Sequence, residues 1–461
     1  MNERSVLSEV RSAVGADFPL ALEQLTELVR IPAIAWESFD RSELGRASAY
    51  VAALARESGL SDVQILQAPR SDGGDGAPAV VGRLPAPPGK PTILLYAHYD
   101  VQPAGDLTMW TSPPFDAVTR AGRLWGRGVA DNKAGVLLHL AAIRSALHVL
   151  GNQLNVGVTV LIDGEEEAGS PSLPLLLQRH GELLHADALI VADSGNWKVG
   201  EPALTTSLRG LILGTIDVRV LDHALHSGTY GGPVIDAVAA LARVLASLHH
   251  DDGTVAVPGL LSEERPGPTL TEAAFRADAG VPPDAPLAGT GSVTSRLWNK
   301  PALAIIGLDA PTVALSSDTL QPTARARISL SLAPTDDTAA AMESVRRHVE
   351  AQSPFGAEVR FTPGGRTEGF AGDAESPAAQ LMLGAMSETW ATPAVSMGVG
   401  GSIPAVDILS KLFPEAEILV TGAEDPDSRA HGANESIDLG DFRNAIVAEA
   451  LLLARLGGWS G

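Results

Sequence analysis

The chain has 461 residues, 45% of them hydrophobic and 4% aromatic, so it is long enough for two domains with sizeable cores. Its 55 acidic and 33 basic residues give a formal net charge of −22, which repels nucleic acid and anionic membranes and argues against both as partners. Because the chain has no cysteine, disulfides and thiolate metal ligands are excluded, and any metal must bind to His, Asp or Glu side chains.

The first part of the chain alternates short apolar runs with helical segments, which is typical of a mainly parallel α/β sheet. The apolar runs predict strands at residues 92–97, 156–162 and 188–192, and a helix is predicted at 134–150. Polar or acidic residues follow each strand, at the edge where open α/β sheets place their ligands. We therefore expect an α/β fold, with helices on both faces of the sheet and a site at the carboxyl ends of its strands.

After about residue 207 the pattern changes to strict alternation of polar and apolar residues, which predicts strands with one buried face. Together with two helices, these strands give the order β-α-β-β-α-β of an α+β ferredoxin-like sandwich. A segment rich in Pro, Gly and Asp is predicted to be a long surface excursion within it. The strands are predicted at 215–220, 303–307, 325–332 and 358–361, the helices at 234–248 and from Asp336 onward, and the excursion at 251–286.

From about residue 378 the first pattern resumes, so the first domain is predicted to be discontinuous. We expect a first domain made of residues 1–207 and 376–461, interrupted by an inserted domain at 208–375. The resuming elements are a helix from 378, a Gly-rich loop at 398–402, a strand at 418–420 and a closing helix at 442–456.

Three consecutive carboxylates, Glu165, Glu166 and Glu167, follow the strand at 156–162. Adjacent like charges repel one another, so a bound cation would stabilise them. Taken alone, this run could equally be a solvated loop, and the interpretation depends on partners elsewhere in the chain.

Such partners follow the other predicted strands and turns. His98 has Asp100 two residues later, which could orient its imidazole, and Asp131 lies in a Gly-rich turn before the first helix. Asp193 follows the third strand, and His431 lies in a polar loop near the C-terminus. A single His in such a setting is more often solvated than a ligand, but the joint pattern favours a metal site.

With Glu167 these residues make five ligand candidates. Two metal ions about 3.5–4 Å apart can share one bridging carboxylate and one water. With two further ligands for each ion, such a pair uses all five candidates. Glu166 is then free to act as a general base toward the water that the two ions share. Residues 1–207 and 376–461 are therefore expected to form a metal-binding catalytic domain.

The order of these motifs resembles the dinuclear-zinc metallopeptidase family of carboxypeptidase G, aminoacylase and the carnosine-type dipeptidases, and is most similar to the dipeptidase branch. The resemblance covers nearly the whole chain. Its motifs are His-Tyr-Asp-Val-Gln-Pro at 98–103, Trp-Thr-Ser-Pro-Pro-Phe at 110–115, Gly-Arg-Gly at 126–128 with Asp-Asn-Lys at 131–133, Glu-Glu-Ala-Gly-Ser at 166–170, Leu-His-Ser-Gly at 225–228 and Gly-Gly-Ser-Ile-Pro at 400–404.

The resemblance implies a role for each candidate. Asp131 would bridge two zinc ions, His98 and Asp193 would complete one site, and Glu167 and His431 the other. Glu166 would be the general base and Asp100 the carboxylate behind His98, whereas Glu165 matches no family role and is interpreted as structural. A cis peptide bond is also expected between Asp131 and Asn132.

The inserted domain is implied to be a lid through which the chain forms a homodimer. Its His226 would reach the active site of the partner subunit, and the substrate-binding candidates are His226, Thr319, Gly401 and Ser402. Without the resemblance, the loop that contains His226 could equally be a flexible linker.

Two positions depart from the family pattern. Ala224 stands where relatives commonly carry an Asp behind the lid histidine, unless Asp222 or His223 substitutes. Ser331 stands where dipeptidase relatives place an Arg before Leu-x-Pro, so the substrate class is the inference most affected.

The predicted function is hydrolysis of the peptide bond in dipeptides or short peptides by a metal-bridging water that Glu166 activates. An N-acyl- or N-carbamoyl-amino-acid amidohydrolase with the same chemistry, acting on an amide substrate, is the nearest alternative, and a non-catalytic metal-binding scaffold is a remote one. The cofactors are expected to be two zinc ions per chain, although such ligands also accept manganese or cobalt. Because the sequence shows no signal-peptide core and no long apolar run, we expect a cytoplasmic protein.

Overall fold

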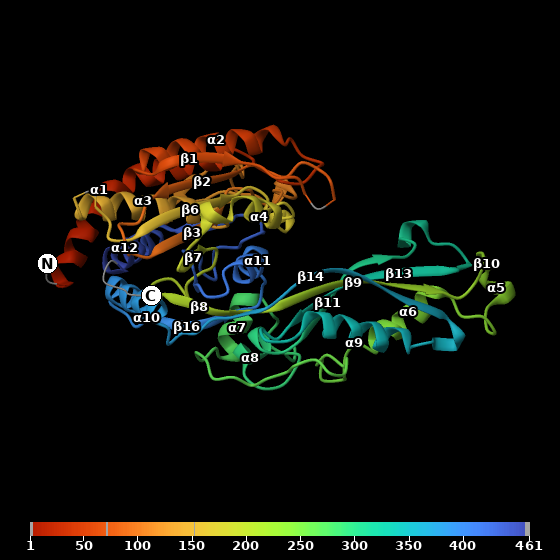
Figure 1. Cartoon of the computed structure of the whole chain (residues 1–461). Coiled ribbons are helices and arrows are strands. Elements are labelled where there is room, and N and C mark those ends of the chain that lie inside the picture. Colours follow the sequence, from red (N-terminus) through yellow and green to blue (C-terminus); the bar gives the residue numbers. More distant parts are fainter. Residues whose placement is uncertain (1–2, 71, 152, 457–461) are drawn as a thin grey trace. The chain divides into compact units, whose positions relative to one another are not determined.

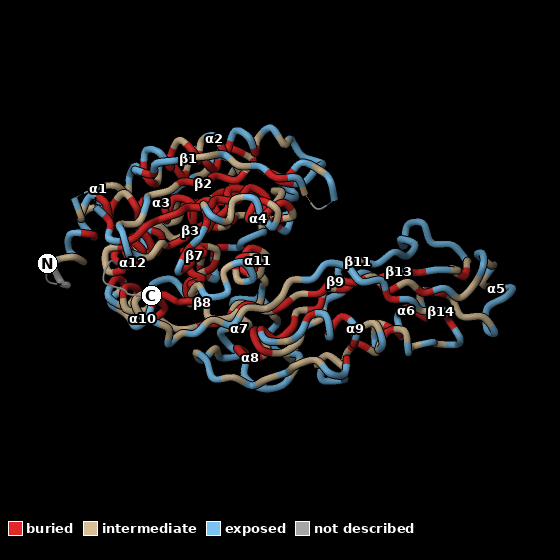
Figure 2. Tube along the Cα trace, in the orientation of Figure 1, coloured by how far each residue is buried: buried red, intermediate tan, exposed pale blue. Residues whose placement is uncertain are grey.

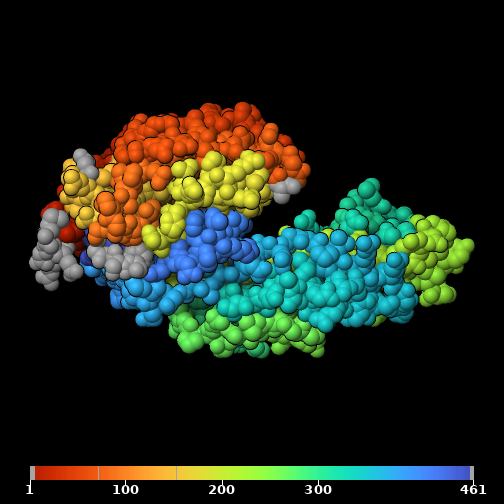
Figure 3. Space-filling model, in the orientation of Figure 1, coloured from red at the N-terminus to blue at the C-terminus, as the bar shows by residue number. Residues whose placement is uncertain are grey.

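The computed structural model describes residues 3–70, 72–151 and 153–456 (Figure 1). The chain divides into two compact units. Unit 1 comprises Met1–Thr206, Gly372–Met397 and Pro404–Gly461, and unit 2 comprises Ser207–Ala371 and Gly398–Ile403. Figure 3 shows red, yellow and blue parts of the sequence lying together on one face of unit 1, because this unit is assembled from separate stretches of the chain.

Unit 1 contains a mainly parallel sheet, as the sequence predicts. Its strands follow the order β1-β2-β6-β3-β7-β17-β8, and the central pairs β6–β3, β3–β7 and β7–β17 are parallel. The predicted strands at 92–97, 156–162 and 188–192 correspond to β3, β6 and β7. The bounds are β1 (Ser61–Leu66), β2 (Ala79–Leu84), β3 (Thr92–His98), β6 (Gly157–Asp163), β7 (Ala188–Ala192), β8 (Ala203–Leu208) and β17 (Glu417–Thr421).

Helices cover both faces of this sheet. The chain passes from β3 through α3 to β6 on one side of β3, and from β6 through α4 to β7 on its other side. Because such crossovers are right-handed, α3 and α4 lie on opposite faces. The helices α1, α2 and α12 contact α3, and α10 contacts α12. The bounds are α1 (Glu3–Val29), α2 (Ser42–Glu57), α3 (Lys133–Val149), α4 (Leu173–Leu184), α10 (Pro377–Trp390), α11 (Pro404–Leu412) and α12 (Leu439–Leu456).

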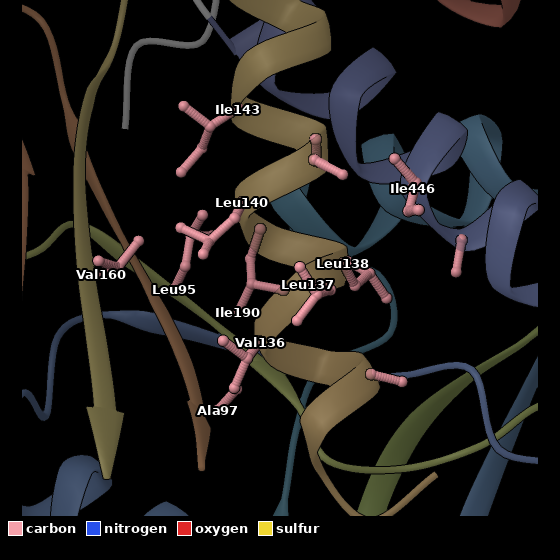
Figure 4. Packing of buried hydrophobic residues seen from close by; sticks show 14 of the residues in the cluster. Leu95, Ala97, Val136, Leu137, Leu138, Leu140, Ile143, Val160, Ile190 and Ile446 are labelled. Atoms are coloured by element: carbon pink, nitrogen blue, oxygen red, sulfur yellow. The ribbon is translucent and has the colours of Figure 1, made fainter. Parts of the chain in front are cut away.

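The core of unit 1 lies between the parallel strands and α3. Leu95, Val160 and Ile190 project from three strands toward Leu137 and Leu140 of the helix (Figure 4). Figure 2 shows the buried residues concentrated in this layer. A rigid sheet fixed in this way holds the carboxyl ends of β3, β6 and β7 close together, and these ends carry the candidate ligands.

Unit 2 contains an antiparallel sheet of the order β11-β13-β9-β14, with α6 and α9 packed against it. The residues of β13 alternate between exposed and buried, as its sequence predicts. Asp337 begins α9 by accepting hydrogen bonds from the backbone N–H groups of Ala339 and Ala340 at 2.9 and 3.0 Å. The bounds are β9 (Gly210–Arg219), β11 (Ala302–Asp309), β13 (Thr323–Leu332), β14 (Glu358–Thr367), α6 (Ala237–Ala246) and α9 (Thr338–Glu350).

The remaining elements are short. The segment 251–286 is largely exposed, as expected, but it contains one helix, α7. In the described part of the chain, no helix combines the length and hydropathy that a membrane span requires. The short elements are β4 (Val118–Arg120), β5 (Arg123–Trp125), β10 (Leu225–His226), β12 (Thr319–Leu320), β15 (Phe370–Ala371), β16 (Val395–Val399), β18 (Ser436–Asp438), α5 (Ser227–Tyr230), α7 (Glu272–Ala279) and α8 (Val293–Trp298), with single 3₁₀ turns at η1 (Leu107–Met109), η2 (Glu166–Ala168), η3 (Val313–Leu315) and η4 (Pro354–Gly356).

Candidate metal centre

His98 is the last residue of β3, and its imidazole is fully buried. Its Nδ1 lies 3.1 Å from the backbone oxygen of Asp100, to which it hydrogen-bonds, and 3.2 Å from Oδ1 of the same residue. These acceptors place the ring proton on Nδ1 and leave a lone pair on Nε2. Nε2 has no hydrogen-bond partner among the described residues, yet it lies 3.2 Å from Oδ1 of Asp131 and 3.5 Å from Oδ1 of Asp193. A buried nitrogen without a partner, facing two carboxylates, fits a metal ion as its missing partner.

Asp131 faces a second imidazole with its other oxygen. Oδ2 of Asp131 lies 2.9 Å from Nε2 of His431, and the same nitrogen lies 3.2 Å from Oε2 of Glu167. The ligand atoms therefore form two groups, each within 4.8 Å, that share Asp131. The peptide bond from Asp131 to Asn132 is cis, which confirms that expectation. The two groups are His98, Asp131 and Asp193, and Asp131, Glu167 and His431.

The local charge balance also suits a cation. The carboxylates of Asp131 and Glu167 raise the pKa of His431 to about 11 despite the partial burial of its ring. Burial lowers the pKa of His98, but the nearby Asp100 and Asp131 outweigh it and raise this pKa well above its usual value. The carboxylates thus favour protonation of both rings. Bound divalent ions would supply the same positive charge. His and carboxylate donors are suited to zinc, and they also accept manganese or cobalt.

Asp100 fixes the backbone of the two acidic residues after β6. Its Oδ1 and Oδ2 accept hydrogen bonds from the backbone N–H groups of Glu166 and Glu167, each at 3.1 Å. Gln102 donates to Glu167 from its backbone and its side-chain amide at 3.1 and 2.7 Å. Oε2 of Glu166 lies 4.0 Å from Nε2 of His98 and belongs to neither ligand group. Burial, and then the charge of Asp193, raise the pKa of Glu166 well above its usual value.

The buried side chain of Glu165 hydrogen-bonds to the backbone of two other loops. Its carboxylate accepts the backbone N–H groups of Ala77 at 2.8 Å and Ser172 at 2.6 Å, and it is buried. It therefore ties the segment after β6 to neighbouring loops, which agrees with its interpretation as structural.

The sequence indicated no role for Asn132. In the structure, this residue hydrogen-bonds to two members of one ligand group, His98 and Asp193. Its Oδ1 accepts the backbone N–H of His98 at 3.2 Å, and its Nδ2 donates to Oδ1 of Asp193 at 3.0 Å. The next residue, Lys133, is fully buried and donates from Nζ to the backbone oxygens of Leu28 and Ile31 at 3.0 and 2.7 Å. The only signal in the sequence was the position of both residues directly after Asp131.

The four substrate-binding candidates all belong to unit 2. His226 and Thr319 face each other in the ladder between β10 and β12. Nδ1 of His226 accepts the backbone N–H of Gly228 at 3.0 Å, and Asp222 pairs with Arg219 instead of with the histidine.

Gly401 and Ser402 lie elsewhere in unit 2. Their loop follows Gly398, which packs against Trp298 of α8, and the backbone oxygen of Gly400 accepts a hydrogen bond from Arg209 at 2.9 Å. Figure 1 shows β10 and α8 toward opposite ends of unit 2, so a single unit does not bring the two pairs of candidates together.

Several known proteins are similar to this chain in sequence or in fold. The model of peptidase family M20/M25/M40 matches residues 94–455. The chain is 34% identical over 388 residues to the cysteinylglycine-S-conjugate dipeptidase of Corynebacterium striatum, covering 83% of this chain and 85% of that protein. It is 26% identical to the Cys-Gly metallodipeptidase DUG1 of Saccharomyces cerevisiae, over 97% of each. The structure of human carnosine dipeptidase 1 has a TM-score of 0.84 at 22% identity and covers 98% of this chain and 99% of that one, which shows a shared fold.

Proposed function

This chain belongs to peptidase family M20/M25/M40, and on that premise we propose that it is a dinuclear metal-dependent dipeptidase that hydrolyses dipeptides or short peptides. The observation that carries the proposal is the pair of three-residue ligand groups sharing Asp131. A carboxylate that presents one oxygen to each of two imidazoles is the arrangement that a bridged pair of ions requires.

In this proposal, His98 and Asp193 would hold one zinc ion, Glu167 and His431 would hold the other, and Asp131 would be shared between them. When bound, the two ions lower the pKa of a shared water and polarise the scissile carbonyl. Asp100 keeps the ring proton of His98 on Nδ1, so that Nε2 can act as a ligand.

Glu166 is the proposed general base. It lies beside the ligand groups without belonging to either, and its backbone is fixed by Asp100. Its carboxylate takes a proton from the attacking water and returns it to the leaving amine, and both transfers need a group within hydrogen-bond reach of the water.

The inserted domain, 208–375, is proposed to be a ferredoxin-like lid that also forms a homodimer. Its edge strand β11 and the turn after it carry large exposed apolar side chains, which would be covered by a second copy. In such a dimer His226 would reach the partner's site, and Thr319, Gly401 and Ser402 are the other proposed substrate-binding residues. The exposed side chains are Ile305, Ile306, Leu308, Val313 and Leu315, with exposed fractions of 49, 54, 55, 92 and 78%. We also assign the protein to the cytoplasm, on its sequence alone.

The test is a substrate panel with purified, zinc-loaded protein. Cysteinylglycine and β-alanylhistidine, which the names of two relatives give as substrates, are compared with N-acetyl- and N-carbamoyl-amino acids. The proposal expects a higher kcat/KM on the free dipeptides. Preferential cleavage of the N-acylated compounds would assign the protein to the amidohydrolases, and no hydrolysis of either set by protein with both ions bound would support a scaffold.

A further inference from the structure

A buried ion pair next to the metal centre has no role in the chemistry proposed so far. Nη1 of Arg127 donates to Oε2 of Glu435 at 2.6 Å, and the two side chains are only 2% and 0% exposed. Removing two charges from water is costly, so such a pair persists where both groups gain further hydrogen bonds. Arg127 lies four residues before Asp131, and Glu435 lies four residues after His431.

Glu435 holds the turn that carries Asp131. Its Oε1 accepts the backbone N–H groups of Ala130 at 2.9 Å and of Asp131 itself at 3.0 Å. Its Oε2 accepts the backbone N–H of Gly128 at 2.9 Å together with Arg127. One carboxylate therefore accepts four hydrogen bonds, three of them from the backbone of Gly128, Ala130 and the shared ligand Asp131.

Arg127 joins the same turn to two other loops. Its Nη2 donates to the backbone oxygen of His431 at 3.1 Å and to that of Pro103 at 3.3 Å. Its guanidinium also stacks on the ring of Trp110, 5.4 Å from the centroid. The pair thus connects the turn of Asp131 with the backbone of His431 and with the loop that follows His98 and Asp100.

The ligand group of His98 and Asp193 is positioned by a different residue. Asn132 hydrogen-bonds to the backbone of His98 and to the carboxylate of Asp193, and among the described residues neither Arg127 nor Glu435 forms a hydrogen bond or ion pair with these two ligands. The ligands of the two groups are therefore positioned largely by different hydrogen-bond networks. The networks meet at the turn of Asp131 and at Asp100, which lies beside His98 and accepts the backbone N–H of Glu167.

We propose that Arg127 and Glu435 are positioning residues for the group of Asp131, Glu167 and His431, and that they raise its metal affinity more than that of the group containing His98, because the pair holds His431 as well as the shared Asp131. This inference rests on the dinuclear site of the proposed function. Groups that orient metal ligands typically contribute about 10- to 100-fold to affinity.

The experiment titrates Zn²⁺ into chelator-treated protein by calorimetry and compares Glu435→Gln with wild type. A glutamine has nearly the same shape, but its NH₂ group must face two N–H donors that the carboxylate accepted. The wild type should bind two ions. The variant should bind one ion about 10- to 100-fold more weakly and the other with a smaller loss, because Asp131 is shared by both groups.

Glu449→Gln is the matched control. Glu449 is also buried and pairs with an imidazole, that of His139, at 2.8 Å, but it contacts no candidate ligand among the described residues. It should leave both affinities unchanged. Arg127→Lys is the second variant, because a lysine keeps the charge but cannot reproduce the fork that reaches Glu435 and His431 together. Circular dichroism reports whether each variant is folded.

The possible outcomes separate the two proposals. Wild-type protein that binds fewer than two ions would refute the dinuclear function itself. If wild type binds two ions and every folded variant of the pair keeps both affinities, or loses both equally, the positioning role is overturned. A clearly larger loss of affinity for one ion than for the other in Glu435→Gln or Arg127→Lys, with Glu449→Gln unchanged, supports it.

Discussion

Asp100 accepts the backbone N–H of Glu166 at 3.1 Å through the same oxygen, Oδ1, that lies 3.2 Å from Nδ1 of His98. The position of the proposed base is therefore coupled to the orientation of a proposed ligand through one buried carboxylate. Because this hydrogen bond uses the backbone of Glu166, its side chain can be changed without releasing the segment.

Glu166→Gln should therefore retain the fold and two bound zinc ions but lose activity by orders of magnitude. The amide is nearly isosteric with the carboxylate, yet it cannot accept a proton from water. Metal analysis and kcat on the same preparation test this. Turnover near that of wild type would show that Glu166 is not the base.

Asp131→Ala should weaken the binding of both ions, because Asp131 is the one residue common to the two ligand groups. Asp193→Ala, by comparison, should weaken mainly the ion near His98. Metal content after dialysis measures both effects, and chelation of wild type should abolish hydrolysis reversibly. Full activity in excess chelator would contradict the dinuclear mechanism.

Much of the fold follows from the sequence where a single pattern determines an element. The apolar run at 188–192 predicted the bounds of β7, and alternation at 325–332 predicted most of β13. The ligand candidates could also be found, because His and acidic residues follow strands whose carboxyl ends meet at one edge of a sheet.

Other features depend on contacts between residues distant in sequence. Glu435 seemed to be an ordinary residue of a polar loop, and its four hydrogen bonds come from a turn about 300 residues earlier. Glu165 could be separated from its acidic neighbours only by its failure to match a family role. The long helix α1 was not predicted at all; Pro19 interrupts its sequence pattern, yet packing against α3 and α12 supports the helix.

Asp163 gives a prediction for the dependence of stability on pH. It is buried at the end of β6, and burial, and then the charge of Asp100, raise its pKa to about 6. Below about pH 4 the carboxyl is protonated in both folded and unfolded chains. Between about pH 4 and 6 the folded chain keeps a proton that the unfolded chain loses, so Asp163 makes the folded state less stable as pH rises through this range.

Asp163→Asn should remove this dependence. Its amide can still accept the N–H of Gly164, and the hydroxyl of Ser170 can reverse to accept from Nδ2. Relative to the variant, wild type should lose roughly 2–3 kcal/mol of unfolding free energy between about pH 4 and 7. Urea unfolding of both proteins across this range measures the difference, and parallel curves would contradict the assignment.

His226 should act across a dimer. Mixing His226→Ala with Glu166→Gln, each inactive alone, should recover part of the activity, because a mixed dimer pairs one intact lid histidine with the partner's intact base. Subunit exchange is verified first with differently tagged chains. Absence of recovery after exchange would indicate that His226 acts within its own chain or has no catalytic role.

Ser331 predicts an unusual substrate preference. It lies on β13 opposite Ala302 and Leu211, where the family resemblance places an Arg that would bind the substrate carboxylate bidentately. A single hydroxyl cannot reproduce that interaction. Arg327 lies on the same strand and has no hydrogen bond or ion pair among the described residues. Four residues at about 3.3 Å each separate it from Ser331 by roughly 13 Å, too far to take over the role of an Arg at position 331.

Wild type should therefore bind ordinary dipeptides weakly, or prefer substrates whose far end is uncharged or bulky. Ser331→Arg should lower KM for free dipeptides more than for their amidated counterparts, because only the free carboxylate can pair with the new guanidinium. Ser331→Gln is the control, since it adds length without charge. If wild type already cleaves free dipeptides efficiently and the ratio of free to amidated kcat/KM is the same in Ser331→Arg, then the carboxylate is bound by other residues and Ser331 does not determine specificity.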